Sequence, residues 1–167
     1  IASIAAAAVA AVFAWQTFGL GLRWYVSGHA PWSNAYETMV YVGWATVLSG
    51  LVFARRSRLA PALAALMGGV ALFVSNLNWL DPQITPLVPV LKSYWLMIHV
   101  SVVTASYGFF GICAACGIAS LAATAFGRNL RELRAINEMA MIVGLALLTA
   151  GIFFGAVWAN ESWGRYW

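Results

Sequence analysis

The chain has 167 residues, of which 63% are hydrophobic and 8% are charged. Because a soluble globular domain carries about 25% charged residues, this composition excludes an ordinary soluble protein and predicts one embedded in a lipid bilayer. Nine Lys and Arg residues outnumber five Asp and Glu residues, and in a membrane protein such an excess marks the cytoplasmic loops, so we expect no nucleic-acid partner.

The apolar segments predict an all-α fold, a polytopic transmembrane helical bundle of about five spanning helices with short loops. The expected spans are residues 1–22, 34–53, 59–76, 94–126 and 139–159. The first segment has neither the basic leader nor the small-residue cleavage site of a signal peptide, so it is expected to be a span. Since the sequence begins on an apolar residue other than Met, we expect residues 1–167 to form a single integral membrane domain of a larger protein.

Two clusters of arginine indicate how this bundle is oriented. Six of the nine basic residues lie in two segments that separate spans: Arg55, Arg56, Arg58, Arg128, Arg131 and Arg134. Strict alternation of five spans places both segments on one side, which the positive-inside rule identifies as cytoplasmic. The segments 23–33, 77–93 and 160–167 are then expected to face outward.

The tryptophans are distributed unevenly between the two sides. Seven of the nine lie in or beside the outward segments: Trp24, Trp32, Trp79, Trp95, Trp158, Trp163 and Trp167. An aromatic belt that anchors a protein in the membrane should mark both interfaces, so it explains a one-sided distribution poorly. The pattern indicates an aromatic surface with a function on the outer face, with belt anchoring as the alternative.

Both histidines, His29 and His99, fall on the outer side. His99 follows Tyr94 by about 7.5 Å along a helix, which places it just below the outer surface. Because burying an ionisable residue in a membrane costs free energy, His99 is a candidate functional residue. The alternative is a neutral imidazole that only hydrogen-bonds a neighbouring helix. His29 lies in a loop, where it could bind a ligand, support another ligand or be merely exposed.

The outer residues suit a porphyrin better than a bare metal ion. A zinc site needs three or four converging His, Cys or carboxylate ligands, and the outward segments show no such spacing. Haem iron needs one axial imidazole from each side, and aromatic faces cover its flat ring well. Three basic residues on this side could pair with haem propionates or be solvated loop charges: Arg23, Lys92 and Arg165.

A helix start is predicted at Asn34. The pair Asn34 and Glu37 fits a capping box, in which Asn34 accepts hydrogen bonds from first-turn amides and Glu37 returns to the Asn34 amide. A structural role is therefore favoured for Glu37 over a role in chemistry.

Two small-residue motifs inside spans are interpreted as helix packing. Cys113 and Cys116 form a C-x-x-C, but redox motifs of this kind use an exposed helix N-terminus to activate a thiol, whereas this pair lies in mid-helix. Counting from His99, Cys113 lies about 21 Å deeper in the membrane. Gly151 and Gly155 form a G-x-x-x-G, which is typical of close helix contacts in membranes.

The most distinctive motif of the chain is the C-terminal run GAVWANESWGRYW. It resembles the opening of the WWD signature, so residues 158–167 are expected to begin that signature, which continues in the family as W-x-W-D-P-K-E. The upstream segments GHAPWSNAYETMVYVGW and WLMIHVSVVTASYGFF resemble the first outward loop and the histidine-bearing helix of the same family. Together the three segments resemble System II cytochrome c biogenesis proteins, the CcsA/ResC family of WWD-domain haem-handling proteins.

The resemblance implies a haem-binding subunit of a cytochrome c synthase in the bacterial inner (cytoplasmic) membrane. Such a subunit presents haem on the periplasmic face for covalent attachment to apocytochrome c, together with a partner subunit or fused domain. His99 matches an axial ligand of the haem iron and is the expected metal ligand, and no catalytic acid or base is implied. The haem-binding residues that the resemblance implies are His99, Trp158, Trp163, Arg165, Tyr166 and Trp167.

Two other functions stay open from the sequence. A membrane transporter or channel module would show broken helices or polar residues in mid-membrane, and these spans have few. A haem-b electron-transfer protein would hold haem within the membrane between histidines on facing helices, whereas only His99 lies in an expected span.

Overall fold

The computed structural model describes residues 2–87, 89–128 and 131–166, and all regular structure in these ranges is helical. The helices are α1 (Ala2–Ser27), α2 (Ala35–Val52), η1 (Phe53–Arg55), α3 (Leu59–Ser75), η2 (Pro89–Lys92), α4 (Tyr94–Ala125) and α5 (Arg131–Trp163). The prediction of an all-α bundle is therefore confirmed.

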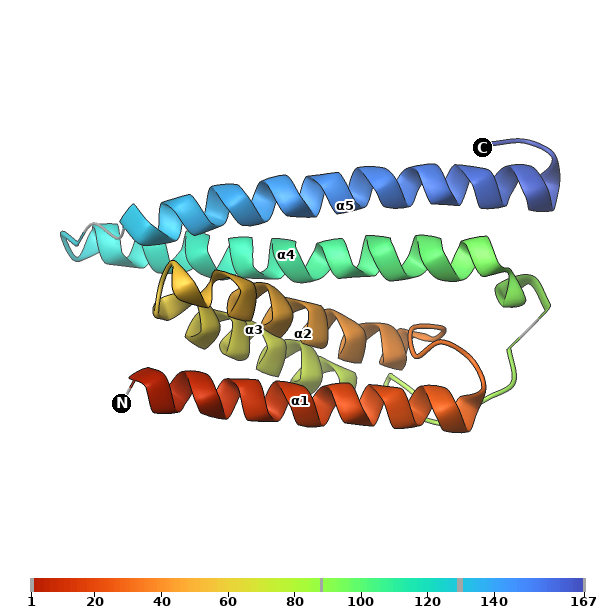
Figure 1. The fold of residues 1–167 in the computed structure, drawn as a ribbon, viewed down its shortest axis with the longest axis horizontal. Helices are drawn as coiled ribbons and strands as arrows, with labels where there is room; N and C mark the ends of the chain where they lie inside the picture. Colours follow the sequence, from red (N-terminus) through yellow and green to blue (C-terminus); the bar gives the residue numbers. More distant parts are fainter. Residues whose placement is uncertain (1, 88, 129–130, 167) are drawn as a thin grey trace.

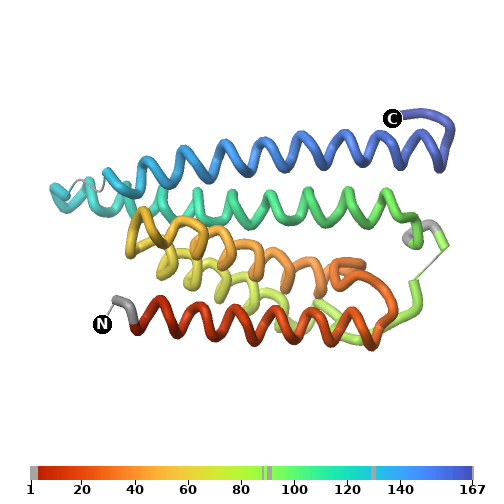
Figure 2. Tube along the Cα trace, viewed as in Figure 1, coloured from red at the N-terminus to blue at the C-terminus, as the bar shows by residue number. Residues whose placement is uncertain are grey.

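Successive α-helices run in opposite directions along the long axis of the molecule (Figures 1 and 2). Helices α4 and α5 pack against each other along most of their length, α2 packs on both α3 and α4, and α1 makes only light contact with α2 and α3. Figure 1 shows α1 and α5 on opposite sides, with the other helices between them.

This alternation gives the bundle two distinct ends. The arginine end is formed by the α2–α3 turn at 53–58 and the α4–α5 turn that begins at 126–128, and the start of α1 lies at the same end (Figure 1). The opposite end, called here the tryptophan end, holds residues 24–34, the segment 76–87, the start of α4, and residues 158–166 at and just beyond the end of α5. Both predicted arginine clusters thus lie on one side of the molecule.

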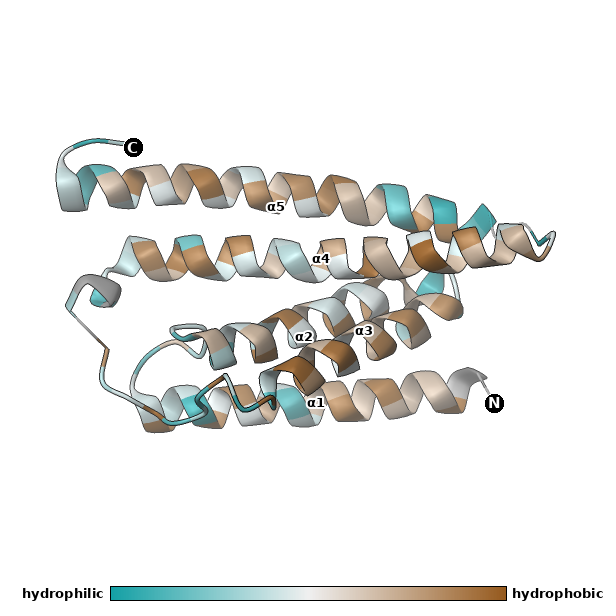
Figure 3. Ribbon diagram, turned by 180° about the vertical axis from the view of Figure 1, so that it is seen from behind, coloured by the Kyte–Doolittle hydropathy of each residue, from teal (hydrophilic) through white to brown (hydrophobic). Residues whose placement is uncertain are grey.

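Four helices are long and apolar enough to cross a membrane: Ile4–Ser27, Ala35–Arg55, Tyr94–Ala125 and Arg131–Trp163. Helix α3 has 17 residues and is about 26 Å long, somewhat shorter than the ~30 Å hydrocarbon core of a bilayer. Figure 3 shows that hydrophilic residues of α5 gather near its two ends, while its middle is mostly hydrophobic. The chain is a multi-pass membrane protein.

Helix α5 is longer than its apolar segment predicts. It begins at Arg131 and ends at Trp163 rather than covering only 139–159. The early turns are polar in composition, but Leu133 and Ile136 lie three positions apart on one helix face and are almost completely buried. Packing of that face therefore continues the helix into a segment whose charge suggests a loop.

Helix α1 also extends beyond the predicted 1–22. It continues to Ser27 and ends where Gly28 adopts a φ of +68° and donates its amide hydrogen to the Trp24 carbonyl at 3.0 Å. A left-handed residue after the last turn is a common helix terminator, and glycine adopts it without steric cost. As a result, Arg23 and Trp24 lie on a helix rather than in the expected outward loop.

The hydrophobic core lies toward the arginine end. Its buried members come from η1, α3, α4 and α5: Phe53, Ala60, Ala64, Ile112, Cys116, Leu133, Ile136 and Ala140. Helices α2 and α3 meet almost backbone to backbone, because a Cβ atom added at Gly50 would overlap the Ala64 Cβ and lie 2.9 Å from the Ala60 carbonyl oxygen.

Both cysteines are free and pack in this region. Cys116 belongs to the core, and the Cys113 thiol donates to the Asn137 carbonyl oxygen at 3.4 Å. Their surroundings are consistent with the packing interpretation of the C-x-x-C motif.

Candidate functional site

Tryptophan side chains mark the end of the bundle opposite the arginines. Six of the seven expected there are described and belong to α1, α4, α5 and the connecting segments: Trp24, Trp32, Trp79, Trp95, Trp158 and Trp163. The seventh, Trp167, lies outside the described residues. Trp15 and Trp44 lie well inside α1 and α2.

His99 is half-buried between α4 and α5, one turn into α4. Its ring atom Nδ1 lies 2.7 Å from the carbonyl oxygen of Gly151 in α5. Because a carbonyl oxygen can only accept, this contact requires the proton on Nδ1. In the neutral ring the other nitrogen, Nε2, then carries the lone pair, and none of the described residues hydrogen-bonds to it.

A neutral imidazole held in this way is the form that binds metals. Metal-ligating histidines usually donate their second ring N–H to a carbonyl or carboxylate, which fixes the tautomer and raises the basicity of the ligating nitrogen. The geometry at His99 therefore leaves one ring nitrogen, Nε2, available to a ligand. In the described residues no group of three or more His, Cys, Asp or Glu could hold a metal ion.

Gly155 gives the His99 ring its space. A Cβ atom added at Gly155 would lie 2.7 Å from both Cε1 and Nδ1 of His99, closer than real Cβ contacts allow. At Gly151 an added Cβ would lie 3.2 Å from the backbone nitrogen of Val103, so α4 and α5 approach closely here. The close helix packing expected of the G-x-x-x-G motif is present. The same two glycines also contact the His99 ring, Gly151 through its carbonyl oxygen and Gly155 through its missing side chain.

Aromatic rings lie next to His99 on both helices. Trp95, one turn before His99, stacks on Phe154 with ring centroids 6.2 Å apart. Trp158 contacts Trp163 edge to face at 4.8 Å, and its indole Nε1 is buried with no hydrogen-bond partner among the described residues. A buried donor without an acceptor costs free energy, so a ligand oxygen that reached Trp158 would stabilise it.

The two remaining predicted site residues of the described chain, Arg165 and Tyr166, lie beyond the end of α5. The helix ends at Gly164, which has a φ of +69° and donates its amide hydrogen to the Asn160 carbonyl at 2.8 Å. Both Arg165 and Tyr166 are exposed. The structure therefore brings His99, Trp158 and Trp163 to one end of the α4–α5 hairpin, where Trp163, like Arg165 and Tyr166, is exposed.

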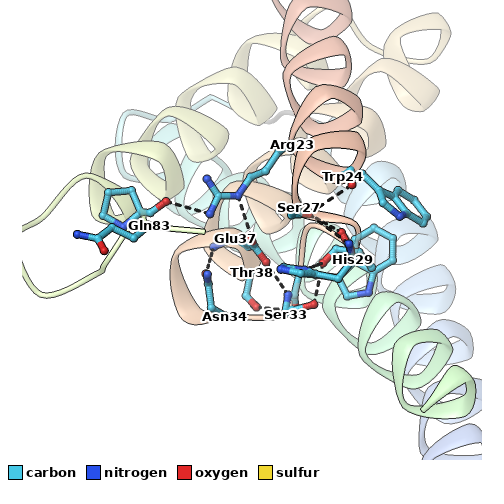
Figure 4. A network of polar contacts seen from close by, with 12 residues as sticks. Arg23, Trp24, Ser27, His29, Ser33, Asn34, Glu37, Thr38 and Gln83 are labelled. Carbon is cyan, nitrogen blue, oxygen red and sulfur yellow. Dashed lines mark hydrogen bonds and ion pairs between the residues drawn. The ribbon is translucent and has the colours of Figure 1, made fainter. Parts of the chain in front are cut away.

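An ion pair joins α1 to α2 at the tryptophan end (Figure 4). Arg23 Nε donates to Glu37 Oε1 at 2.8 Å, and the Glu37 side chain is 0% exposed. Asn34 Oδ1 accepts from the Glu37 amide at 2.8 Å, as predicted. The other half of the expected capping box is wrong, because Glu37 Oε2 accepts from the amide of Ser33 at 2.9 Å rather than from that of Asn34.

Arg23 also reaches the segment between α3 and α4. It donates from its guanidinium to the Pro82 carbonyl oxygen at 3.0 Å, and its charge lies 5.2 Å from the ring centroid of Tyr36. Since these contacts occupy the guanidinium, Arg23 is a poor candidate for a propionate partner. Lys92 and Arg165 are exposed and stay candidates.

His29 lies in the loop after α1, and its Nδ1 is 3.2 Å from the Ala30 carbonyl oxygen. Its Nε2 is buried and has no hydrogen-bond partner among the described residues. A pocket of about 490 Å³ opens beside it. The pocket is lined by Ser27, Gly28, His29, Pro86, Leu87, Lys92 and Met97.

A row of rings that the sequence did not predict connects this loop to the middle of α2. Trp32 contacts Trp24 at 5.3 Å and Tyr41 at 4.8 Å, and Tyr41 stacks on Trp44 at 5.5 Å. The Trp32 indole also donates to the Met97 carbonyl of α4 at 3.2 Å. Tyr41 and Trp44 lie three positions apart, a spacing that puts both rings on one face of a helix, and this is the sequence signal for the row.

Known proteins resemble this chain over most of its length. The family described as "Cytochrome C assembly protein" matches residues 32–167. The chain is 51% identical to protein NrfI of Wolinella succinogenes, over 93% of this chain and 18% of that protein. It is 34% identical to the cytochrome c biogenesis protein CcsA of Parasynechococcus marenigrum, over 90% of this chain and 62% of that protein. The CcsA protein of Guillardia theta is also 34% identical, over 90% of this chain and 60% of that protein.

The chain thus spans about three fifths of the length of the CcsA relatives and less than a fifth of NrfI. The family match begins at Trp32 and includes α2 to α5, and so the helix of His99 and the C-terminal tryptophans. It confirms the resemblance expected from the sequence: the chain belongs to the cytochrome c assembly protein family.

Proposed function

We propose that this protein binds haem at the tryptophan end of the bundle, with Nε2 of His99 as an axial ligand of the iron, and presents it for attachment to apocytochrome c. The observation that carries the proposal is the hydrogen bond from His99 Nδ1 to the Gly151 carbonyl. It leaves Nε2 as the nitrogen with a lone pair, and a single imidazole is what one face of haem iron needs.

The neighbouring residues fit a porphyrin ligand. Trp158, Trp163 and Tyr166 would contact the ring, since aromatic faces pack well on flat apolar surfaces. Arg165 would pair with a propionate through charge-assisted hydrogen bonds. Trp167 keeps the ring-contacting role that the family resemblance implies. Bound haem supplies two vinyl groups, across which the S–H bonds of the apocytochrome cysteines add to form thioether links.

The distribution of arginine supports an orientation for this chemistry. With the arginine end on the cytoplasmic side, the positive-inside rule places the tryptophan end on the periplasmic side of the bacterial inner membrane. Residues 1–167 would act as one membrane domain together with a partner subunit or fused domain of the synthase. The relative CcsA is named a cytochrome c biogenesis protein, which supports a role of this chain in that process.

Neither alternative function gains a specific observation. Helices α4 and α5 are unbroken through 94–125 and 131–163, whereas transporters typically form their binding sites from interrupted helices. His29 lies in a loop and His99 on α4, so the described histidines do not hold a haem between two facing helices.

The test uses the natural full-length protein purified with its haem. We expect His99→Ala to lose most of the Soret absorbance and cytochrome c maturation, and added imidazole to restore the absorbance by replacing the missing ligand. His29→Ala, which changes the other histidine at the same end, is the matched control and should keep its haem. Unchanged spectra and maturation in His99→Ala would contradict the proposal.

A further inference from the structure

We infer that Gly155 is a positioning residue for His99: its missing side chain lets α5 hold the imidazole with the proton on Nδ1 and the ligating lone pair on Nε2. The inference deepens the proposed function and rests on it for its consequence in haem binding. Its geometric part concerns the haem-free protein and can be tested separately.

Position 155 has no room for a side chain beside the His99 ring. An added Cβ at Gly155 would lie 2.7 Å from Nδ1 and Cε1 of His99 and 3.3 Å from Cγ. The edge of the ring that carries Nδ1 therefore faces α5. Any side chain at position 155 must push this edge away, because a Cβ atom essentially never lies within 3.0 Å of a neighbouring atom.

Helices α4 and α5 are held close together on either side of this contact, so they cannot easily move apart. The Nδ1–carbonyl contact to Gly151 is already 2.7 Å, and one turn deeper the backbone of α5 at Gly151 closely approaches Val103 of α4. A methyl group at position 155 would therefore rotate the His99 ring and break its hydrogen bond before it separated the helices.

The hydrogen bond to Gly151 determines which nitrogen of the neutral His99 ring carries the proton. Without the carbonyl acceptor, the ring can place its proton on either nitrogen, and the fraction with a free lone pair on Nε2 falls. Loss of a hydrogen bond that orients a metal-binding histidine typically lowers metal affinity 10–100-fold. Gly155 would thus influence haem binding without touching haem itself.

Gly144 provides a matched control on the same helix. An added Cβ there would lie 2.7 Å from the ring of Phe110 in α4, so Gly144→Ala perturbs the same pair of helices to a similar degree. Its neighbour is apolar, and it has no connection to the proton of His99. If Gly155 mattered only for helix packing, Gly155→Ala and Gly144→Ala would have the same effect on His99.

The direct experiment is nitrogen NMR on full-length haem-free protein labelled with 15N-histidine in lipid vesicles, with His99→Ala used to assign the His99 signals. We expect wild-type His99 to be protonated on Nδ1, Gly155→Ala to shift signal toward the Nε2-protonated form, and Gly144→Ala to match wild type. A wild-type ring protonated mainly on Nε2 would overturn the inference, even if Gly155→Ala failed to fold.

Haem titration then separates the two proposals. We expect Gly155→Ala to bind haem about 10–100-fold more weakly and added imidazole to reverse this loss, with Gly144→Ala close to wild type. An altered tautomer with undiminished haem affinity would overturn the consequence proposed for haem. If His99→Ala also kept its haem, the failure would lie with the proposed function, while the tautomer result would still support the positioning role.

Discussion

The two ends of the bundle are built in different ways. At the arginine end, Ile112, Leu133 and Ala140 are all 0% exposed, and small residues let the helices meet closely. At the tryptophan end, every residue of α4 from 94 to 103 is at least partly exposed. Apart from the close approach of α4 and α5 at Gly151 and Gly155, the helices there are joined by individual hydrogen bonds and ring contacts.

This difference separates stability from ligand binding. Close packing of apolar and small side chains fixes the helices at the arginine end. A polar imidazole and exposed rings would weaken a core. Because the core lies at the other end, the tryptophan end can hold these groups where a ligand can reach them. The comparison predicts that substitutions at the arginine end change stability first, and those at the tryptophan end change haem binding first.

The largest loss of stability is expected for Gly50→Ala, because the new methyl group overlaps Ala64 and approaches the Ala60 carbonyl. Overpacking against backbone should lower the free energy of unfolding by about 3 kcal/mol. Thermal unfolding in detergent measures the effect. Gly69→Ala in α3 is the control, since an added Cβ there meets nothing within 4 Å. Equal stability of the two variants would show that the arginine end is not closely packed.

The next largest effect is expected for Glu37→Ala at the tryptophan end. It leaves Arg23, whose side chain is only 19% exposed, without its carboxylate. Removing one partner of a buried pair costs about 3–5 kcal/mol, and because Arg23 can partly rehydrate we expect about 2 kcal/mol. Hydrogen exchange should become faster at the Ser33 amide, which loses Glu37 Oε2 as its acceptor.

The matched control for this substitution is Glu161→Ala, which removes an exposed carboxylate at the same end. Its stability should stay within about 0.5 kcal/mol of wild type. If Glu37→Ala behaved in the same way, the Arg23 ion pair would not hold the tryptophan end together.

The sequence predicts three of the helices to within a residue or two. The expected 34–53, 59–76 and 94–126 correspond to α2, α3 and α4, because long apolar runs there end at charged or capping residues. It underestimates α5 because Leu133 and Ile136 pack through partners elsewhere in the chain, which composition does not reveal.

The candidate site was predictable to the same extent: local spacing places its residues, whereas its long-range contacts do not show in the sequence. Counting along a helix from Tyr94 places His99 near the outer end, and the structure agrees. Its acceptor, the Gly151 carbonyl, is 52 residues away in the chain. That pairing depends on the register between α4 and α5, so a local pattern such as G-x-x-x-G predicts a close contact but not which side chain it holds.

A smaller effect, confined to haem binding, is expected for Trp95→Leu. The ring stacks on Phe154 one turn from His99, and loss of an aromatic contact costs about 0.5–1.5 kcal/mol. We expect haem affinity to fall several-fold with little change in unfolding. Trp79→Leu, at an indole that is 75% exposed, is the control for a tryptophan at the same end. Equal haem loss in both would indicate a general effect of tryptophan and not a site beside His99.

The smallest effect on haem binding is expected for the double variant Cys113→Ala and Cys116→Ala. Both thiols are free and lie in mid-helix toward the arginine end, so their removal should cost only the contacts of two sulfur atoms, about 1 kcal/mol. Haem content and cytochrome c maturation should stay at wild-type levels, because the pair lies far along α4 from His99. A variant that unfolds normally but loses maturation would show that the thiols take part in the chemistry, and that function is not confined to the tryptophan end.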